Sequence, residues 1–331
     1  MSFTNTFDTT NTGSAVSNRE DLTDVLTILA PEETPILSSA DKKKASSTFV
    51  EWTVDSLAAP STSGISEGAD VTAFTDQFAG RAKLGNRVQK FRRDYMVSDM
   101  QEAVDSVGPA KIAQAEAKAI RELKRDIEAT LASANTQATE NGAGTANALG
   151  GLGDWIQNAA GSGNVPAAFQ TPAASVVDAG ATLSESEFNG LITSIFGVTG
   201  STNNLMLIAD TTLRSDISDF ARTTASATDN VRSVNYDGNS GEIKLSVDLY
   251  QSDHGVVSIV NGNPDCMPTQ GGTAGMMGYL VNPEYYGVHE LIPMGSTRLP
   301  NLGGGERGFV DCALTLGVYH PGAHGKIVDP A

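Results

Sequence analysis

The sequence is long and strongly acidic. Its 331 residues suffice to bury a sizeable core in one large domain or two smaller ones. The 22 basic and 39 acidic residues give a formal net charge of −17 at pH 7. Such a chain is repelled by phosphate backbones and anionic lipid, which disfavours sequence-specific nucleic-acid binding and a membrane-surface role. The 40% apolar residues and 34 glycines predict a folded, turn-rich protein.

Cysteine usage and the amino-terminal sequence set the expected compartment. Cys266 and Cys312 have neither metal-ligand nor disulfide-framework spacing, so we expect small buried thiols in a reducing compartment. The opening sequence MSFTNTFDTTNTGSAVSNRED contains no basic region followed by an apolar one, and about 18 consecutive apolar residues occur nowhere. We therefore expect a soluble protein without an export signal.

Residues 1–47 have the composition of an arm. They are polar, are interrupted by Pro31 and Pro35, and contain one short amphipathic helix pattern at 21–29. Because such a segment buries little surface of its own, we expect it to be either mobile or ordered against another subunit.

Residues 48–97 are predicted to form an extended β-hairpin. In TFVEWTVDSL (48–57), Val50, Trp52 and Val54 alternate with polar residues, which is the period of a strand. The returning run RAKLGNRVQKFRRDYMVS (81–98) mixes charged and large apolar side chains on both faces. Since a buried unpaired charge costs several kcal/mol, we predict that the hairpin projects from the body and is covered by a neighbouring copy. The alternative is a solvated hairpin with basic decoration.

The side chains expected to make these contacts are basic, aromatic and acidic. They are Arg81, Arg87, Arg92, Arg93, Trp52, Phe91, Tyr95, Glu67, Asp70 and Asp76. The basic ones belong to a cluster, because residues 81–125 hold 11 of the 22 lysines and arginines. Such a cluster needs an acidic partner. We expect the hairpin-tip acids, and Glu122 and Glu128, of an adjacent copy to supply it, with DNA as the other candidate.

Residues 98–182 are predicted to form a peripheral domain around a long spine helix. Ser98 and Gln101 have the spacing of a capping box, and Pro109 stands where a second helix restarts. A 26-residue helix from there to about residue 134 would be about 39 Å long. One apolar stripe runs along it. The stripe consists of Ile112, Ile120, Leu123, Ile127 and Leu131. Residues 135–180 are typical of loops and irregular strands.

Residues 183–295 are predicted to form an axial α/β domain, and 296–331 to return to the peripheral domain. The capping box of Ser184 and Glu187 begins a helix with an apolar stripe, and a buried strand at 205–209 leads into a second helix. Further strand patterns occupy 242–250, 256–260, 278–281 and 310–318.

Motifs for catalysis or cofactor binding are missing from the sequence. It contains neither a Walker loop nor a GxSxG elbow. The glycine-rich stretch at 271–278 lacks fingerprint spacing and is expected to be a flexible loop. His320 and His324 are separated by Pro321, which prevents the helical presentation used by zinc hydrolases. We therefore predict no enzyme activity and no catalytic, cofactor-binding or metal-binding residues.

The order of these parts resembles that of the Hong Kong 97-type capsid proteins of tailed bacteriophages. Blocks similar to those of the family's major head proteins are REDLTDVLTILAPEETPILS (19–38), RVQKFRRDYMVSDM (87–100) and AKAIRELKRDIEATL (117–131). LMLIADTTLRSDISDF and ALTLGVYHPGAHGKI, near the other end, are similar too. The resemblance implies an α+β fold with an amino-terminal arm, an extended hairpin loop, a spine helix, a peripheral domain and an axial α/β domain.

The resemblance also implies a function. Copies of the subunit would assemble into hexamers and pentamers of an icosahedral or elongated head that encloses DNA without sequence-specific binding. Cement or decoration, scaffold and portal proteins are candidate further partners, although the sequence does not reveal whether cement or scaffold proteins are used. The head would assemble in the host bacterial cytoplasm and become part of the virion. The family implies no catalytic residues. The alternatives are a cellular compartment shell of the same fold, expected to have a cargo-peptide pocket, and a β-rich surface binding protein, which requires an export signal.

Overall fold

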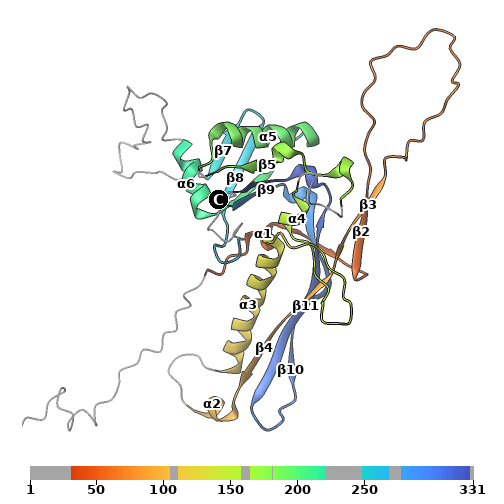
Figure 1. Cartoon of the computed structure of the whole chain (residues 1–331). Coiled ribbons are helices and arrows are strands. Elements are labelled where there is room, and N and C mark those ends of the chain that lie inside the picture. The colour runs from red at the N-terminus through yellow and green to blue at the C-terminus, as the bar shows by residue number, and fades with distance from the viewer. Residues whose placement is uncertain are drawn as a thin grey trace, which may run out of the picture.

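The chain forms two packed units and one projection. The computed structural model describes residues 31–104, 111–157, 165–180, 182–220, 248–267 and 277–328. One unit is a long, narrow sheet with a helix along it, and the other is a six-stranded sheet with helices beside it (Figure 1). The projection is a two-stranded hairpin that ends in a wide loop (Figure 1).

The narrow sheet has four strands in the order β1-β10-β11-β4. Their bounds are Asp41–Lys44 for β1, Gln89–Val97 for β4, Tyr286–Leu299 for β10 and Glu306–Val318 for β11. β10 and β11 form a long antiparallel hairpin, to which β4 adds antiparallel and β1 parallel. The predicted strand at 310–318 is confirmed, because its alternating apolar side chains from Val310 to Val318 are buried.

The spine helix α3 (Ile112–Ala132) covers one face of this sheet (Figure 1). Leu123, Ile127 and Leu131 are fully buried, so the predicted apolar stripe is confirmed. Each such side chain contributes about 1.5–3 kcal/mol on burial, and together they fix the helix against the strands. The helix begins three residues later than predicted, and Pro109 lies outside the described residues.

The second unit is a six-stranded sheet in the order β5-β12-β9-β6-β8-β7. The bounds are Val176–Asp178 (β5), Leu205–Ala209 (β6), Leu249–Ser252 (β7), Gly255–Asn261 (β8), Met277–Val281 (β9) and Gly325–Val328 (β12). The helices α5 (Glu185–Thr199) and α6 (Thr211–Phe220) pack on it. This mixture of parallel and antiparallel strands with helices agrees with the predicted α/β unit.

Helix α5 shows how local sequence sets its ends. The predicted capping box is present, since the Ser184 hydroxyl accepts the Glu187 N–H and the Glu187 carboxylate accepts the Ser184 N–H. The helix stops at Gly200, whose φ of +68° is the left-handed conformation that glycine adopts without strain. Its apolar face, Phe188 to Ile195, is buried, whereas Phe196 is exposed and stacks on the ring of His254.

The projecting hairpin consists of β2 (Phe49–Val54) and β3 (Ala82–Arg87), joined by the loop of residues 55–81. The prediction that it continues to residue 97 is wrong. At Val88 the chain leaves the hairpin, and the following strand, β4, joins the four-stranded sheet. The physical reason is that the apolar side chains of β4 find cover against α3 within the same chain.

Three other strands differ from the predictions, two in the domain to which they were assigned and one in not having been predicted. β1 lies within the predicted arm, and β12 joins the six-stranded sheet instead of the peripheral one. Strand β10 was not predicted, because Pro293 and Gly295 interrupt its alternation and its outer half is exposed. The helix pattern at 21–29 and residues 242–247 lie outside the described residues.

Short helices complete the fold. They are α1 (Pro35–Ser39), α2 (Asp99–Ala103) and α4 (Leu152–Trp155), with one-turn 3₁₀ helices at Ala167–Phe169, Ala173–Ser175, Pro283–Tyr285 and Pro321–Ala323. Ser98 caps α2 by accepting the Gln101 N–H, as predicted. Among the helices of the described residues, none combines the length and apolar character needed to cross a bilayer.

Candidate assembly surface

The base of the projecting hairpin is rigidly attached to the body. Asn86, fully buried in β3, donates to the carbonyls of Gly150 and Leu316 at 3.0 and 2.8 Å. Trp52 on β2 is half-buried and packs against the rings of Trp155 and Tyr319, with centroid distances of 5.5 and 6.0 Å. The direction in which the hairpin leaves the body is therefore fixed by the chain's own contacts, and Trp52 belongs to this anchor.

The two ends of the loop 55–81 are held together at the top of the hairpin. The Arg81 guanidinium donates to the Asp55 carboxylate at 2.9 Å and lies over the ring of Phe78, 4.1 Å from its centroid. Between these ends the loop extends away from both units (Figure 1). Arg81 thus has an acidic partner within its own hairpin.

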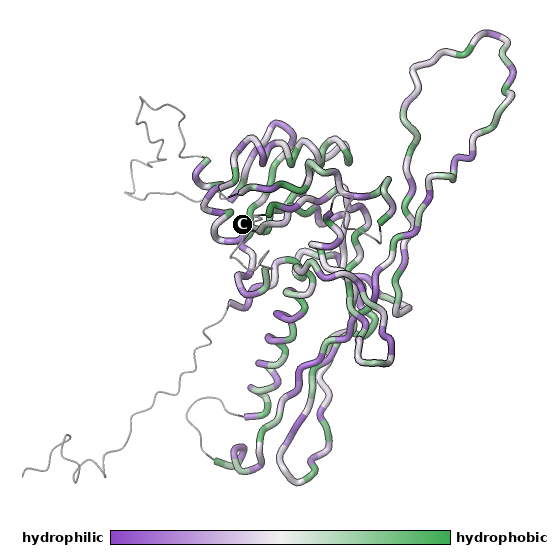
Figure 2. The backbone as a smooth tube through the Cα atoms, viewed as in Figure 1, coloured by the Kyte–Doolittle hydropathy of each residue, from purple (hydrophilic) through white to green (hydrophobic). Residues whose placement is uncertain are grey.

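The loop exposes apolar side chains that the described residues do not cover. Leu57, Ile65 and Phe74 are 100, 88 and 91% exposed, and Val71 and Phe78 are also exposed. Apolar and polar residues are interspersed along the whole loop (Figure 2). The acids Glu67, Asp70 and Asp76 are exposed there too, and residues 55–80 contain four acids and no base. A projecting surface of this composition is typical of a protein interaction site.

Strand β4 divides the predicted contact residues between its two faces. Phe91 and Tyr95 point toward α3 and are buried, so the prediction that a neighbouring copy covers them is wrong. Arg93 shares this face and forms two hydrogen bonds with Asp126 of α3, at 2.5 and 2.7 Å. Arg87, at the end of β3, lies over the ring of Phe49.

The other face of the narrow sheet is open. It carries β4 side chains and the β11 and β10 residues paired with them. They are Lys90, Arg92, Asp94, Met96, Ile292, Leu299, Arg307, Phe309 and Asp311. Lys90 pairs with Asp311 at 2.9 Å, whereas Arg92 has no ion pair with any described residue. No described helix covers this face, which we call the outer sheet face. Apolar and basic groups together make it a second candidate surface.

Glu128 does not serve as an acidic partner for a neighbouring copy. Its side chain is buried between α3 and α1, where both carboxylate oxygens accept backbone N–H groups. The predicted role for Glu128 is therefore wrong, because the helical pattern did not show that α1 covers this position. Glu122 remains partly exposed and pairs with Lys118.

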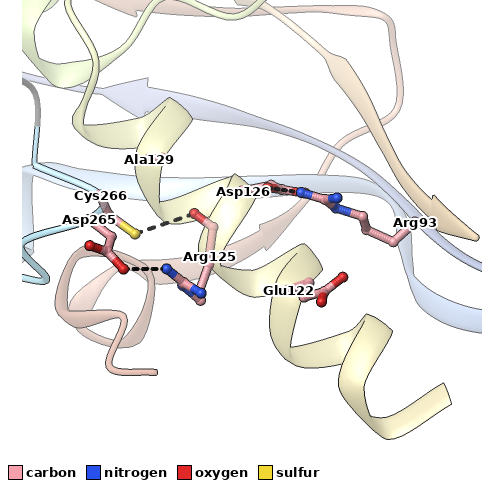
Figure 3. Close-up of a pocket in the computed structure, with 7 residues that line it drawn as sticks. All are labelled: Arg93, Glu122, Arg125, Asp126, Ala129, Asp265 and Cys266. Carbon is pink, nitrogen blue, oxygen red and sulfur yellow. Dashed lines mark hydrogen bonds and ion pairs between the residues drawn. The ribbon is translucent and has the colours of Figure 1, made fainter. Parts of the chain in front are cut away.

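A pocket of about 200 Å³ lies beside α3 (Figure 3). It is lined by Arg93, Glu122, Arg125, Asp126, Ala129, Asp265 and Cys266. Arg125 pairs with Asp265 at 2.5 Å, and the Cys266 thiol, whose pKa is raised by burial, lies near the Arg125 carbonyl. The acids outnumber the bases and the arginines are already paired, so the pocket is a structural junction and not an anion site. No cluster of three or more metal-ligating side chains occurs in the described ranges.

The spine helix along a narrow sheet, the separate α/β unit and the projecting loop together define a shell protein of the Hong Kong 97-like capsid fold. Solved structures agree with this assignment. The capsid of cyanophage P-SCSP1u is 13% identical with a TM-score of 0.62, covering 99% of this chain and 98% of that one. The capsid of cyanophage A-1(L) is 15% identical with a TM-score of 0.60, covering 97% and 98%.

A match between the sequence and a family model identifies the family. The family model described as SU10 major capsid protein matches residues 3–331, so the chain belongs to the SU10 major capsid protein family. Its fold and family are those of a structural shell subunit of the virion. No curated protein matches the sequence significantly. The holo-SrpI encapsulin of Synechococcus elongatus PCC 7942 shares the fold at 11% identity and a TM-score of 0.53, covering 95% of this chain and 93% of that one.

Proposed function

We propose that copies of this chain form the hexamers and pentamers of a phage head, with the loop 55–81 of one copy lying on the outer sheet face of the next. The exposed apolar side chains of the loop carry this proposal, because a projecting loop held at a rigid base gains little by exposing Leu57, Ile65 and Phe74 to water. The outer sheet face offers apolar side chains, including Met96 and Phe309, as matching cover.

Charge favours the same pairing. Residues 55–80 carry four acids and no base, whereas the outer sheet face has three bases, Lys90, Arg92 and Arg307, against the two acids Asp94 and Asp311. Exposed pairs contribute only about 0.2–1 kcal/mol each. Repeated throughout a shell, they supply register and orientation more than affinity.

In this proposal the head forms in the host cytoplasm, with cement, scaffold and portal proteins as further partners, and encloses DNA without reading its sequence. The encapsulin likeness supports a second candidate, a cellular compartment shell. Negative-stain microscopy of the chain, expressed alone and together with the proteins encoded beside it, tests the proposal. Closed shells with nuclease-protected DNA support the phage head, and shells loaded with a host protein favour the compartment. Absence of any ordered assembly in both preparations overturns both.

The R92E and R93E variants should separate assembly from folding. R92E reverses a charge on the outer sheet face, so we expect impaired assembly at low salt and a Tm within about 2 °C of the wild type. R93E removes the two bonds to Asp126 and places a further acid beside Asp126 and Glu122, which should lower the free energy of unfolding by about 1 kcal/mol. Thermal melts and light scattering measure the two effects. Normal, salt-insensitive assembly of R92E contradicts the proposed docking face.

Free subunits should not bind DNA at physiological salt. A net charge of −17 repels the phosphate backbone, and Arg93, Arg121 and Arg125 pair with acids of the same chain. A mobility-shift assay at about 150 mM salt should therefore show no retarded complex, with a basic protein of similar mass as the positive control. A retarded band at micromolar protein would make DNA the acidic partner of the basic cluster.

A further inference from the structure

A buried glutamate joins the spine helix to the segment that precedes β1. The Glu128 side chain is 1% exposed. One of its oxygens accepts the Ile36 N–H at 2.8 Å, and the other accepts the Leu37 N–H at 2.9 Å. Both N–H groups lie in the first turn of α1, where no intrahelical acceptor is available to them. Glu128 therefore caps a helix that lies 91 and 92 positions away in the sequence.

Among the residues that the structure describes, no cationic group compensates this carboxylate. In the described part of the chain it has no ion pair, and the arginines of its own helix pair elsewhere, Arg121 with Glu32 and Arg125 with Asp265. The titratable groups of the described residues that face it from other elements are the phenol of Tyr286 on β10 and the thiol of Cys266. Burial raises the pKa of Tyr286 to about 12 and also raises that of Cys266, so both are neutral near pH 7. Beyond the ring of Tyr286 lies His324, whose pKa burial lowers to about 4.

The remaining contacts of this segment are either neutral or at the surface. Ile36 is fully buried in the core, and Ser39 shares a hydrogen bond of 2.5 Å with the Tyr286 hydroxyl. Asn263 donates to the Glu33 carbonyl at 2.9 Å. Among the described contacts of this segment, Glu128 is therefore the one through which a change of charge in the interior reaches it.

We infer that Glu128 is a proton-dependent latch, which seats residues 35–40 on the spine helix and sets how firmly the arm is held to the body. The inference goes beyond the proposed assembly, because it concerns the unassembled subunit. It also gives a role to an otherwise unfavourable group, since burying a carboxylate without a cationic partner is costly.

Burial of Glu128 determines whether the seating of residues 35–40 becomes stronger or weaker as pH rises. Burial raises the pKa of Glu128 from 4.5 to about 7, although the two N–H groups act against it. When the segment leaves, water reaches the carboxylate and its pKa falls back toward the ordinary value. The seated form thus binds the proton more tightly, so seating is firmest at low pH and weakens as pH rises through about 7. A difference of about 2.5 pKa units corresponds to a change of up to about 300-fold in the seating equilibrium.

Hydrogen exchange of the full-length, unassembled chain tests the latch. After correction for intrinsic exchange rates, protection of peptides covering residues 35–40 should fall as pH rises from 5.5 to 8.5, while α5 peptides keep theirs. In E128Q the side chain stays neutral at every pH, so the midpoint should disappear and the protection of residues 35–40 should not change with pH. E122Q, on the same helix but away from α1, should behave as the wild type.

Three outcomes overturn the latch. They are a wild-type chain whose 35–40 protection is independent of pH, an E128Q variant that keeps the midpoint, and a Y286F variant that loses it. Y286F removes the Ser39 hydrogen bond and retains Glu128, so the latch requires that its midpoint stays near 7. The Y286F measurement tests the latch even if the E128Q variant fails to fold. Failure of shell assembly affects none of these readouts.

Discussion

Removing residues 57–80 should leave a folded subunit that forms no shells. The described loop makes its contacts within itself and with the top of its own hairpin, so its loss costs little folding energy. Its apolar side chains, by contrast, are the surface that we propose to dock on a neighbour. In the proposed shell, assembly depends on that contact at every subunit, so we expect the loss of assembly to be complete.

The two ends of the deleted segment lie close together in the structure, so they can be joined without disturbing the hairpin. Asp55 and Arg81 are joined at 2.9 Å, and Gly80 lies against Ser56, so the two ends of the loop are already close. Joining Ser56 to Arg81 through Asn-Gly, the pair favoured in two-residue hairpin turns, should preserve the pairing of β2 with β3. We expect a monomer by size-exclusion chromatography, with a Tm within about 3 °C of the wild type, and no particles by electron microscopy.

A matched variant separates the loop's length from its chemistry. Replacing Ile65, Val71 and Phe74 by serine keeps the full loop but removes exposed apolar area, and it should reduce assembly without changing the Tm. Normal shells from the deletion variant would show that another surface drives assembly. Normal shells from the serine variant alone would assign the contact to the backbone or the acids of the loop.

Periodic patterns in the sequence predicted the parts of the fold that local chemistry determines. The α3 stripe and the alternating apolar residues of β11 are buried as predicted, and the Ser184 and Glu187 capping box forms its two predicted hydrogen bonds. The two helices have one apolar side and one polar side, so the hydrophobic effect alone specifies how they face the core. In β11 the alternation marks the large apolar side chains, although both faces of the strand are buried from Cys312 onward.

Elements with mixed faces could not be assigned in this way. In β4, Phe91 alternates with lysine and arginine, and the sequence does not show that α3 covers one face and leaves the other open. The partners of charged side chains could not be predicted from the sequence either. Arg93 pairs with Asp126 and Glu128 binds backbone N–H groups of α1, and both contacts depend on packing between segments distant in the sequence. A cluster of basic residues therefore says little about which charges remain for a partner.

A buried pair of opposite charges ties the two units together. Lys326 on β12 donates from Nζ to the carbonyl of Gly153, in α4, at 3.0 Å, and Asp154 lies buried beside it. Burial lowers the pKa of Lys326 and raises that of Asp154, and each charge partly offsets the shift of the other. The six-stranded sheet is thus joined to the core of the narrow-sheet unit by a hydrogen bond from a charged group.

Replacing Lys326 by methionine should therefore be strongly destabilising. The variant leaves the buried Asp154 without its counter-charge and removes one of two donors to the Gly153 carbonyl, which Gln157 Nε2 still reaches at 3.1 Å. We therefore expect the free energy of unfolding to fall by about 2–4 kcal/mol at pH 8, mainly because of the stranded carboxylate. D154N should cost less, and the double variant should cost less than the sum of the two, because the uncompensated carboxylate is gone. Urea unfolding of the wild type, K326M, D154N and the double variant gives the four free energies of this double-mutant cycle. K44M, which replaces an exposed lysine of β1, is the control.

The pH dependence of the K326M stability deficit shows whether the unpaired Asp154 carboxylate causes it. Without Lys326 the pKa of Asp154 is raised by burial with no offset, so the folded state holds the proton more tightly than the unfolded state. The contribution of Asp154 to stability is then fully present below its unfolded pKa and is lost as pH rises through its folded pKa. The deficit of K326M should be smallest near pH 4 and grow toward pH 8, whereas the D154N/K326M variant should show no such growth. A K326M deficit that is constant with pH, or strictly additive with D154N, would mean that lost packing around the lysine stem, and not the stranded carboxylate, destabilises the chain.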